Sequence, residues 1–150
     1  IVLRAGWMMG GGPKKDKKFI FKILQQIKDG HNVLRVVDDK LGTPTFTFDF
    51  AENAKIILEN EIWGLYNLVC QGITGRFEVA QKILSILNLE EKIKLEKVNS
   101  NYFKEEYFAP RPTSERLINK KLQLRGLDIM RDWETCLEEY LKGSFNKYLS

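Results

Sequence analysis

The stretch FIFKILQQIKDGHNVLRVV, residues 19–37, decides the fold because a helix pattern passes into a strand pattern within it. In its first half, apolar residues recur at helical spacing, and lysines and glutamines occupy the other face. The apolar positions are Phe19, Ile20, Ile23, Leu24 and Ile27. Gly30 ends this helix in a turn, and the run at 33–37 follows as a strand. A helix and a strand joined by a short turn are typical of α/β proteins.

The same alternation is expected along the rest of the chain. Further strands are expected at 1–4, 65–69 and 93–98. Further amphipathic helices are expected from Thr47 or Asp49, over 77–87, and over 133–141, where Gly143 should end the last one. Residues 42–44 predict a turn, and 99–116 an irregular segment. We therefore expect one α/β domain over residues 1–150, with short strands alternating with about four amphipathic helices.

The composition favours a globular protein. The chain of 150 residues is 43% hydrophobic and 29% charged, which disfavours disordered, collagen-like and coiled-coil classes. No apolar run is long enough to span a bilayer or to form a signal peptide, so we expect a soluble, cytoplasmic protein without membrane contact. Cys70 and Cys136 fall inside apolar patterns, which predicts reduced core residues. The single histidine, His31, lies in a turn-like segment and gives no support to a histidine-based catalytic pair.

The segment GWMMGGGPKKDKKF, residues 6–19, combines glycines and lysines as phosphate-binding loops do. A P-loop requires a glycine followed by lysine and then Ser or Thr, but Gly12 precedes Pro13 and the lysines precede Asp16. A dinucleotide fingerprint requires a third glycine where Lys15 stands. Neither motif is present. What remains is a flexible, glycine-rich stretch that carries Trp7 at the C-terminal end of a strand, the edge where α/β sheets bind ligands.

The same segment supports an alternative from a different functional class. It would be a non-enzymatic basic module that binds polyanions or nucleic acid through lysines beside Trp7 and Phe19. These lysines are Lys14, Lys15, Lys17 and Lys18. The net charge of +4 permits such a partner without requiring one. Because Phe19 belongs to the apolar helix face and lysines at a helix start oppose the macrodipole, a solvated charge run is favoured over nucleic-acid binding.

Five blocks of sequence, spread over nearly the whole chain, resemble blocks that occur in the same order in a known family. They are LRAGWMMG at 3–10, LRVVDDKLGTPT at 34–45, GLYN at 64–67 with FEVA at 77–80, RPTSERLINKKL at 111–122 and RDWETCLEEYL at 131–141. Together they are similar to the C-terminal portion of the dTDP-4-dehydrorhamnose reductase family, which are extended short-chain dehydrogenase/reductases acting on nucleotide sugars. The resemblance implies the C-terminal part of an extended Rossmann-type reductase.

The resemblance also implies what lies outside this sequence. Members of the family carry an N-terminal nucleotide-binding half and a Tyr-x-x-x-Lys pair, and no tyrosine here has a lysine four residues later. NADP or NAD would serve the full-length enzyme, and we expect no cofactor to bind this chain alone and no hydride transfer by it. The β-prone start at Ile1 is expected to continue from a missing Rossmann half. The implied partners are that half and a nucleotide-sugar substrate, and a homodimer is compatible with the resemblance.

Two candidate substrate residues follow from the resemblance. Trp7 would face the sugar, because an aromatic face packs well against a pyranose, and a place in the core is the alternative. Arg111 would approach the phosphates of the nucleotide, because a guanidinium fork suits a pyrophosphate, and a surface ion pair is the alternative. Trp133 heads a complete helical stripe and is assigned to the core.

The remaining candidates come from two short segments. Thr43, Pro44 and Thr45 would form a loop near the substrate, although a plain turn explains them almost as well. Ala5 and Gly6 would pass beside the nicotinamide, as cofactor-binding residues.

Three features qualify this resemblance. Ala5-Gly6 replaces the usual Thr-Ser, Lys40 stands where Gln is usual, and Glu115 stands where Ser is usual, so the ligand can differ from the rhamnose precursor.

The neighbouring Asp38 and Asp39 lack a histidine or a third acid beside them, so we predict no metal site there.

Overall fold

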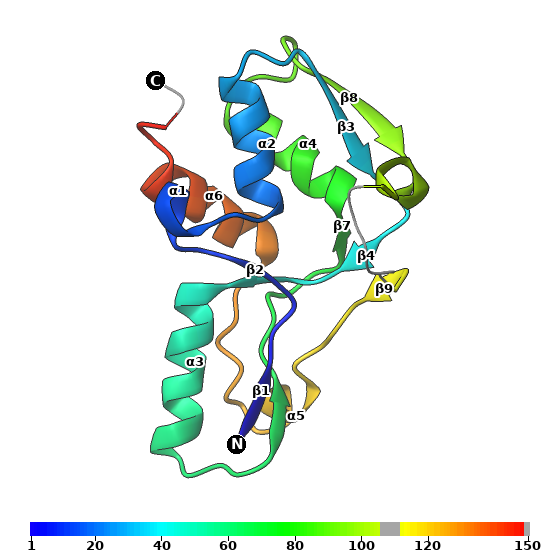
Figure 1. The fold of residues 1–150 in the computed structure, drawn as a ribbon. Coiled ribbons are helices and arrows are strands. Elements are labelled where there is room, and N and C mark those ends of the chain that lie inside the picture. Colours follow the sequence, from blue (N-terminus) through cyan, green and yellow to red (C-terminus); the bar gives the residue numbers. More distant parts are fainter. Residues whose placement is uncertain (106–111, 149–150) are drawn as a thin grey trace.

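The structure, a computed structural model, describes residues 1–105 and 112–148. Figure 1 shows two groups of helices and strands, one above and one below a crossing of short central strands. The strands pair in small sets rather than in one continuous sheet. The α/β class is therefore confirmed, and the described residues contain no helix that is both long and apolar enough to cross a membrane.

The upper group is built on two parallel strands, β3 (Val33–Val37) and β8 (Lys94–Val98). Leu34 and Val36 are buried and Arg35 between them is exposed, the alternation of a half-buried strand. The helices of this group are α2 (Phe19–Lys28), α4 (Arg76–Ile86) and α6 (Trp133–Ser144). The helices and strands predicted here are confirmed within a few residues at their ends, and Trp133 is a core residue as expected.

The lower group joins a second parallel pair, β1 (Val2–Arg4) and β6 (Leu65–Asn67), to α3 (Thr47–Glu59) and α5 (Lys120–Gln123). It has its own core, separate from that of the upper group: Ile57, Ile62, Tyr66, Leu68 and Leu122. Because β1 and β6 run parallel, their carboxyl ends meet at one edge, directly below the central crossing (Figure 1).

The central crossing contains β2 (Trp7–Met9), which pairs in parallel with β5 (Pro44–Phe46). Beside it, β4 (Leu41–Gly42) lies between β7 (Thr74–Gly75) and β9 (Ser114–Glu115). The chain thus leaves β1, passes Ala5 and Gly6, and enters β2 within a few residues. The short helices α1 (Gly12–Lys15) and η1 (Ser100–Phe103) complete the described elements.

Two local predictions are wrong. Residues 42–44 are not a surface turn, because all three are buried: Gly42 ends β4, Pro44 begins β5, and Thr43 joins the two strands. Gly143 does not end the last helix, because α6 continues to Ser144. Gly143 is not among the residues of positive φ, so it stays within the helical turn instead of supplying a left-handed cap.

The glycine-rich segment forms a short helix and is hydrogen-bonded to α6. Gly11 and Gly12 have φ values of 86° and 62°, a conformation that favours glycine, and they lead into α1. The Tyr140 hydroxyl accepts a hydrogen bond from the Gly12 amide at 3.2 Å and donates one to Asp16 Oδ2 at 2.9 Å. Burial, followed by the contact with Asp16, raises the pKa of Tyr140 above its ordinary value. The segment is therefore fastened to α6 by a neutral tyrosine.

A buried polar cluster connects α3 to α6. Asp49 is 5% exposed and accepts hydrogen bonds from Arg131 Nε at 2.9 Å and Nη2 at 2.6 Å, and from Cys136 Sγ at 3.3 Å. Burial alone would raise the pKa of the Asp49 carboxyl, but the bonds from Arg131 and Cys136 lower it below its usual value. A hydrogen bond to Cys70, together with burial, raises the pKa of Cys136. Both cysteines are free and buried, as predicted.

Candidate functional site

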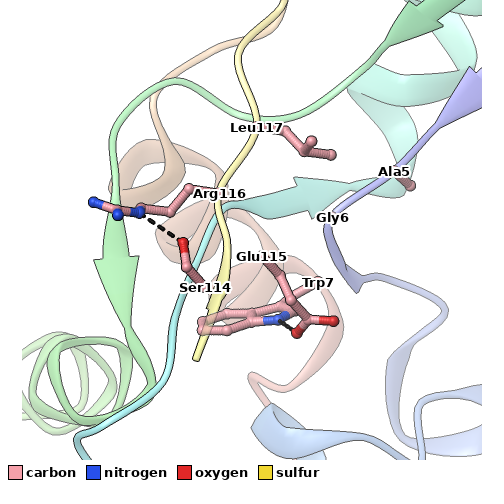
Figure 2. A pocket seen from close by; sticks show the side chains of 7 residues that line it. All are labelled: Ala5, Gly6, Trp7, Ser114, Glu115, Arg116 and Leu117. Atoms are coloured by element: carbon pink, nitrogen blue, oxygen red, sulfur yellow. Dashed lines mark hydrogen bonds between the residues drawn. The ribbon is translucent and has the colours of Figure 1, made fainter. Parts of the chain in front are cut away.

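A cavity of about 320 Å³ lies where the central crossing meets the lower group (Figure 2). Two segments far apart in the sequence line it: residues 5–7, which connect β1 to β2, and residues 114–117, which begin in β9. The cavity therefore adjoins the carboxyl end of the parallel strand β1, the edge at which ligands bind in α/β proteins. Its place in the fold agrees with the position predicted for a ligand cleft.

Trp7 is held in this cavity by both its backbone and its indole ring. Its amide donates to the Thr43 carbonyl at 3.0 Å, and its indole Nε1 donates to Glu115 Oε2 at 2.7 Å. The ring lies against Gly42, where an added Cβ would be 2.3 Å from ring carbons Cε2 and Cζ2. The Arg76 guanidinium lies 5.1 Å from the ring centre. Trp7 is half-buried, so the ring is fixed yet reachable from the cavity.

Thr43, Pro44 and Thr45 form the support behind the cavity and are not among the residues that line it. All three are buried, and both threonine hydroxyls are used within the chain. Thr43 Oγ1 accepts from the Leu117 amide at 3.0 Å, and Thr45 Oγ1 accepts from the Gly6 amide at 2.8 Å. The expected substrate loop is thus a buried segment, and its two threonine side chains hydrogen-bond to both lining segments.

Ala5 and Gly6 line the cavity, as the cofactor prediction requires, but their geometry does not make a dinucleotide site. The Gly6 amide is taken by Thr45. A Cβ at Gly6 would be 1.9 Å from the Thr43 carbonyl oxygen, so this glycine is needed for close backbone packing. The sequence also lacks the glycine motif that holds a pyrophosphate. The residues described therefore do not fit a complete nicotinamide cofactor.

Sequence reasoning missed four lining residues: Ser114, Glu115, Arg116 and Leu117. The only signal was the glutamate at a position where the resembled family usually has serine. Arg116 Nε donates to Ser114 Oγ at 2.8 Å, which turns its exposed side chain away from Trp7 (Figure 2). Arg111, predicted to approach phosphates, lies outside the described residues.

The other charged candidates do not assemble into a site. Asp39 accepts from the amide and hydroxyl of Ser100, and Asp38 forms an ion pair with Lys97 at 3.3 Å. Within residues 1–105 and 112–148, no group of three or more acidic, histidine or cysteine side chains could hold a metal ion.

The two aromatic rings predicted to act with the basic segment have other contacts. Phe19 is half-buried with the Arg76 guanidinium 5.3 Å from its ring, and Trp7 bonds to Glu115 instead of standing beside the lysines. The lysines of residues 14–18 are exposed. The rings of Trp7 and Phe19 do not form a surface beside them on which bases could stack.

Comparisons with known proteins identify relatives of this chain. The dTDP-4-dehydrorhamnose reductase of Mycobacterium tuberculosis is 27% identical over 146 residues, which is 97% of this chain and 46% of that protein. Among solved structures, the dTDP-4-dehydrorhamnose reductase of Yersinia enterocolitica is 33% identical with a TM-score of 0.84, covering 93% of this chain and 48% of that one. The Bacillus anthracis enzyme, in complex with NADP, is 26% identical with a TM-score of 0.78, covering 93% and 46%.

These matches define both the fold and its extent. The chain spans about half the length of the relatives it matches, and the solved structures are Rossmann-type reductases that it matches over their C-terminal half. The family model described as RmlD substrate binding domain matches residues 1–145. The chain therefore belongs to the RmlD substrate binding domain family.

Proposed function

We propose that this chain is the substrate-binding portion of an NAD(P)-dependent reductase that acts on a nucleotide-linked 4-keto sugar, as dTDP-4-dehydrorhamnose reductases do. The observation that carries the proposal is the fixed Trp7 ring in a cavity at the carboxyl end of β1. A volume of about 320 Å³ is at the lower end for small-molecule sites, which suits one sugar ring with the nucleotide extending beyond it.

Within this proposal, each predicted residue has a part. Trp7 packs its ring against the sugar, and Thr43, Pro44 and Thr45 hold that wall in place from behind. Arg111 binds the phosphates of the nucleotide. NADP or NAD, which supplies the hydride in this class of enzyme, is held by a preceding nucleotide-binding half, with Ala5 and Gly6 at the edge that faces it.

The proposal is tested by thermal unfolding of the chain with dTDP-glucose as the ligand. A ligand present at a hundred times its Kd stabilises a folded protein by about 2.7 kcal/mol, which corresponds to a rise in Tm of roughly 5–10 °C for a domain of this size. The rise should be lost in Trp7→Ala and Arg111→Ala. It should persist in Trp63→Ala, because Trp63 is 76% exposed and lies outside the cavity.

The alternative function gives the opposite results. If dTDP-glucose leaves the Tm unchanged while single-stranded DNA binds in a salt-sensitive way, the sugar proposal is wrong. Loss of that DNA binding on combined replacement of Lys14, Lys15, Lys17 and Lys18 would then establish the basic module.

A further inference from the structure

We propose that Glu115 determines the specificity of this site, by positioning Trp7 and by selecting neutral, hydroxyl-bearing sugars over acidic ones. This inference rests on the proposed function and names the sugar class that the cavity accepts. It concerns a side chain that the resemblance left without a role.

The backbone fixes where Glu115 lies. In the pairing of β4 with β9, Gly42 is the register partner of Glu115. Gly42 also lies directly against the Trp7 ring. The glutamate is therefore placed beside the indole by a sheet contact, and its half-buried side chain reaches Nε1 at 2.7 Å. Figure 2 shows the carboxylate directed to the indole edge from the opposite wall of the cavity.

This contact has a direct effect on the orientation of Trp7. An indole N–H can only donate, and a carboxylate is a strong acceptor, so the bond selects one orientation of the ring. Gly42 supports one side of the ring and Arg76 lies near it at 5.1 Å. A serine side chain is shorter and ends in a hydroxyl, so it would supply neither the reach nor the carboxylate. Glu115 is thus a positioning residue for the aromatic surface.

The same carboxylate also brings a negative charge to the Trp7 end of the cavity, which Glu115 lines and the nearby Arg76 does not. It offers about four lone-pair sites, and the indole bond uses one of them. A sugar hydroxyl can donate to the remaining sites, whereas a sugar carboxylate has nothing to donate and is repelled. Arg116, on the same lining segment, points away from Trp7 (Figure 2). The negative charge of Glu115 therefore favours a neutral sugar next to Trp7. It also keeps the phosphates of the nucleotide on the side of the cavity away from Glu115.

The test compares two ligands that differ only at C6 of the sugar, dTDP-glucose and dTDP-glucuronate. Calorimetric titration of the chain gives the ratio of their Kd values for the original sequence, Glu115→Gln and Glu115→Ala. Glu115→Gln keeps an oxygen acceptor for the indole and removes the charge, so the preference for dTDP-glucose should fall about tenfold. Glu52→Gln, an exposed change on α3, is the matched control and should leave the ratio unchanged.

A second measurement separates positioning from charge. In ¹⁵N-labelled protein, the Trp7 indole N–H signal should move in Glu115→Ala, which loses the acceptor, and stay close to its original place in Glu115→Gln. The indole signal of Trp133, which is 8% exposed, reports whether each variant is folded.

The outcomes are distinct. If dTDP-glucose binds and the ratio is the same in the original sequence and Glu115→Gln, the inference is wrong and the proposed function stands. If the Trp7 signal is unmoved in a folded Glu115→Ala, the positioning role is wrong. If neither ligand binds any of the proteins, the proposed function fails and this inference fails with it.

Discussion

The replacement Gly42→Ala tests the packing that fixes Trp7. A Cβ at this position would lie 2.3 Å from two carbons of the indole ring, whereas ordinary contact begins at 3.4 Å. The backbone at Gly42 does not have positive φ, so alanine causes no backbone strain and the clash is the only perturbation. The ring must therefore move by about 1 Å or the strands must separate.

The cost can be worked out from these contacts. Overpacking a fitted position costs about 1–3 kcal/mol, and loss of the bond from Trp7 to Glu115 adds about 1 kcal/mol. We expect Gly42→Ala to lower the free energy of unfolding by about 2–4 kcal/mol, a fall in Tm of roughly 5–15 °C. The Trp7 indole signal should shift with it.

Urea unfolding followed by circular dichroism measures the free energy, and Gly143→Ala is the control. No atom lies within 4 Å of a Cβ at Gly143, which sits inside α6. Alanine there should raise stability by about 0.5–1 kcal/mol through helix propensity. If Gly42→Ala has the same free energy of unfolding as the original sequence and the Trp7 indole signal does not move, the packing account of this site is refuted.

Further predictions concern the two buried polar clusters. Asp49→Asn should lower the free energy of unfolding by about 2–3 kcal/mol in urea, at the low end for a buried ion pair because Arg131 is 40% exposed and regains water. Because folding lowers the pKa of Asp49, the ionised carboxylate stabilises the folded chain above the unfolded pKa of about 3.9, and this stabilisation is lost as the pH falls through the folded pKa. Acid titration should therefore show a fall in the free energy of unfolding below about pH 4, and the fall should be smaller in Asp49→Asn. Tyr140→Phe should cost about 1–2 kcal/mol and speed amide hydrogen exchange at Gly12, and unchanged exchange would show that the hydroxyl does not fasten the glycine segment.

The elements that were predictable from sequence carry their own periodic signal. The helix at 19–28 and the strand at 33–37 place apolar side chains on one face over enough residues to be recognised without knowing what they pack against. The turn predicted at 42–44 failed because Gly-Thr-Pro has the local chemistry of a turn. Pairing of β5 with β2 overrides that preference, and it is a tertiary contact that no local pattern contains.

The site was predictable only in part for the same reason. Trp7 could be proposed because it follows a strand, and ligands bind at strand ends. Glu115 could not, because it is 108 residues away in the sequence and meets Trp7 only through the pairing of β9 with β4. The buried roles of Thr43 and Thr45 were likewise hidden, since hydroxyls in a turn-like sequence look solvated until their partners are known.

Titration of ¹⁵N-labelled chain with dTDP-glucose, followed through the three tryptophan indole N–H signals, tests the sugar site most directly. Trp7 lines the cavity, Trp63 is 76% exposed elsewhere, and Trp133 is 8% exposed in the core. We expect the Trp7 signal to shift with saturation while the signals of Trp63 and Trp133 stay in place. A Trp7 signal that does not respond at saturating ligand, or all three signals moving together, would contradict the assignment of this cavity to the sugar.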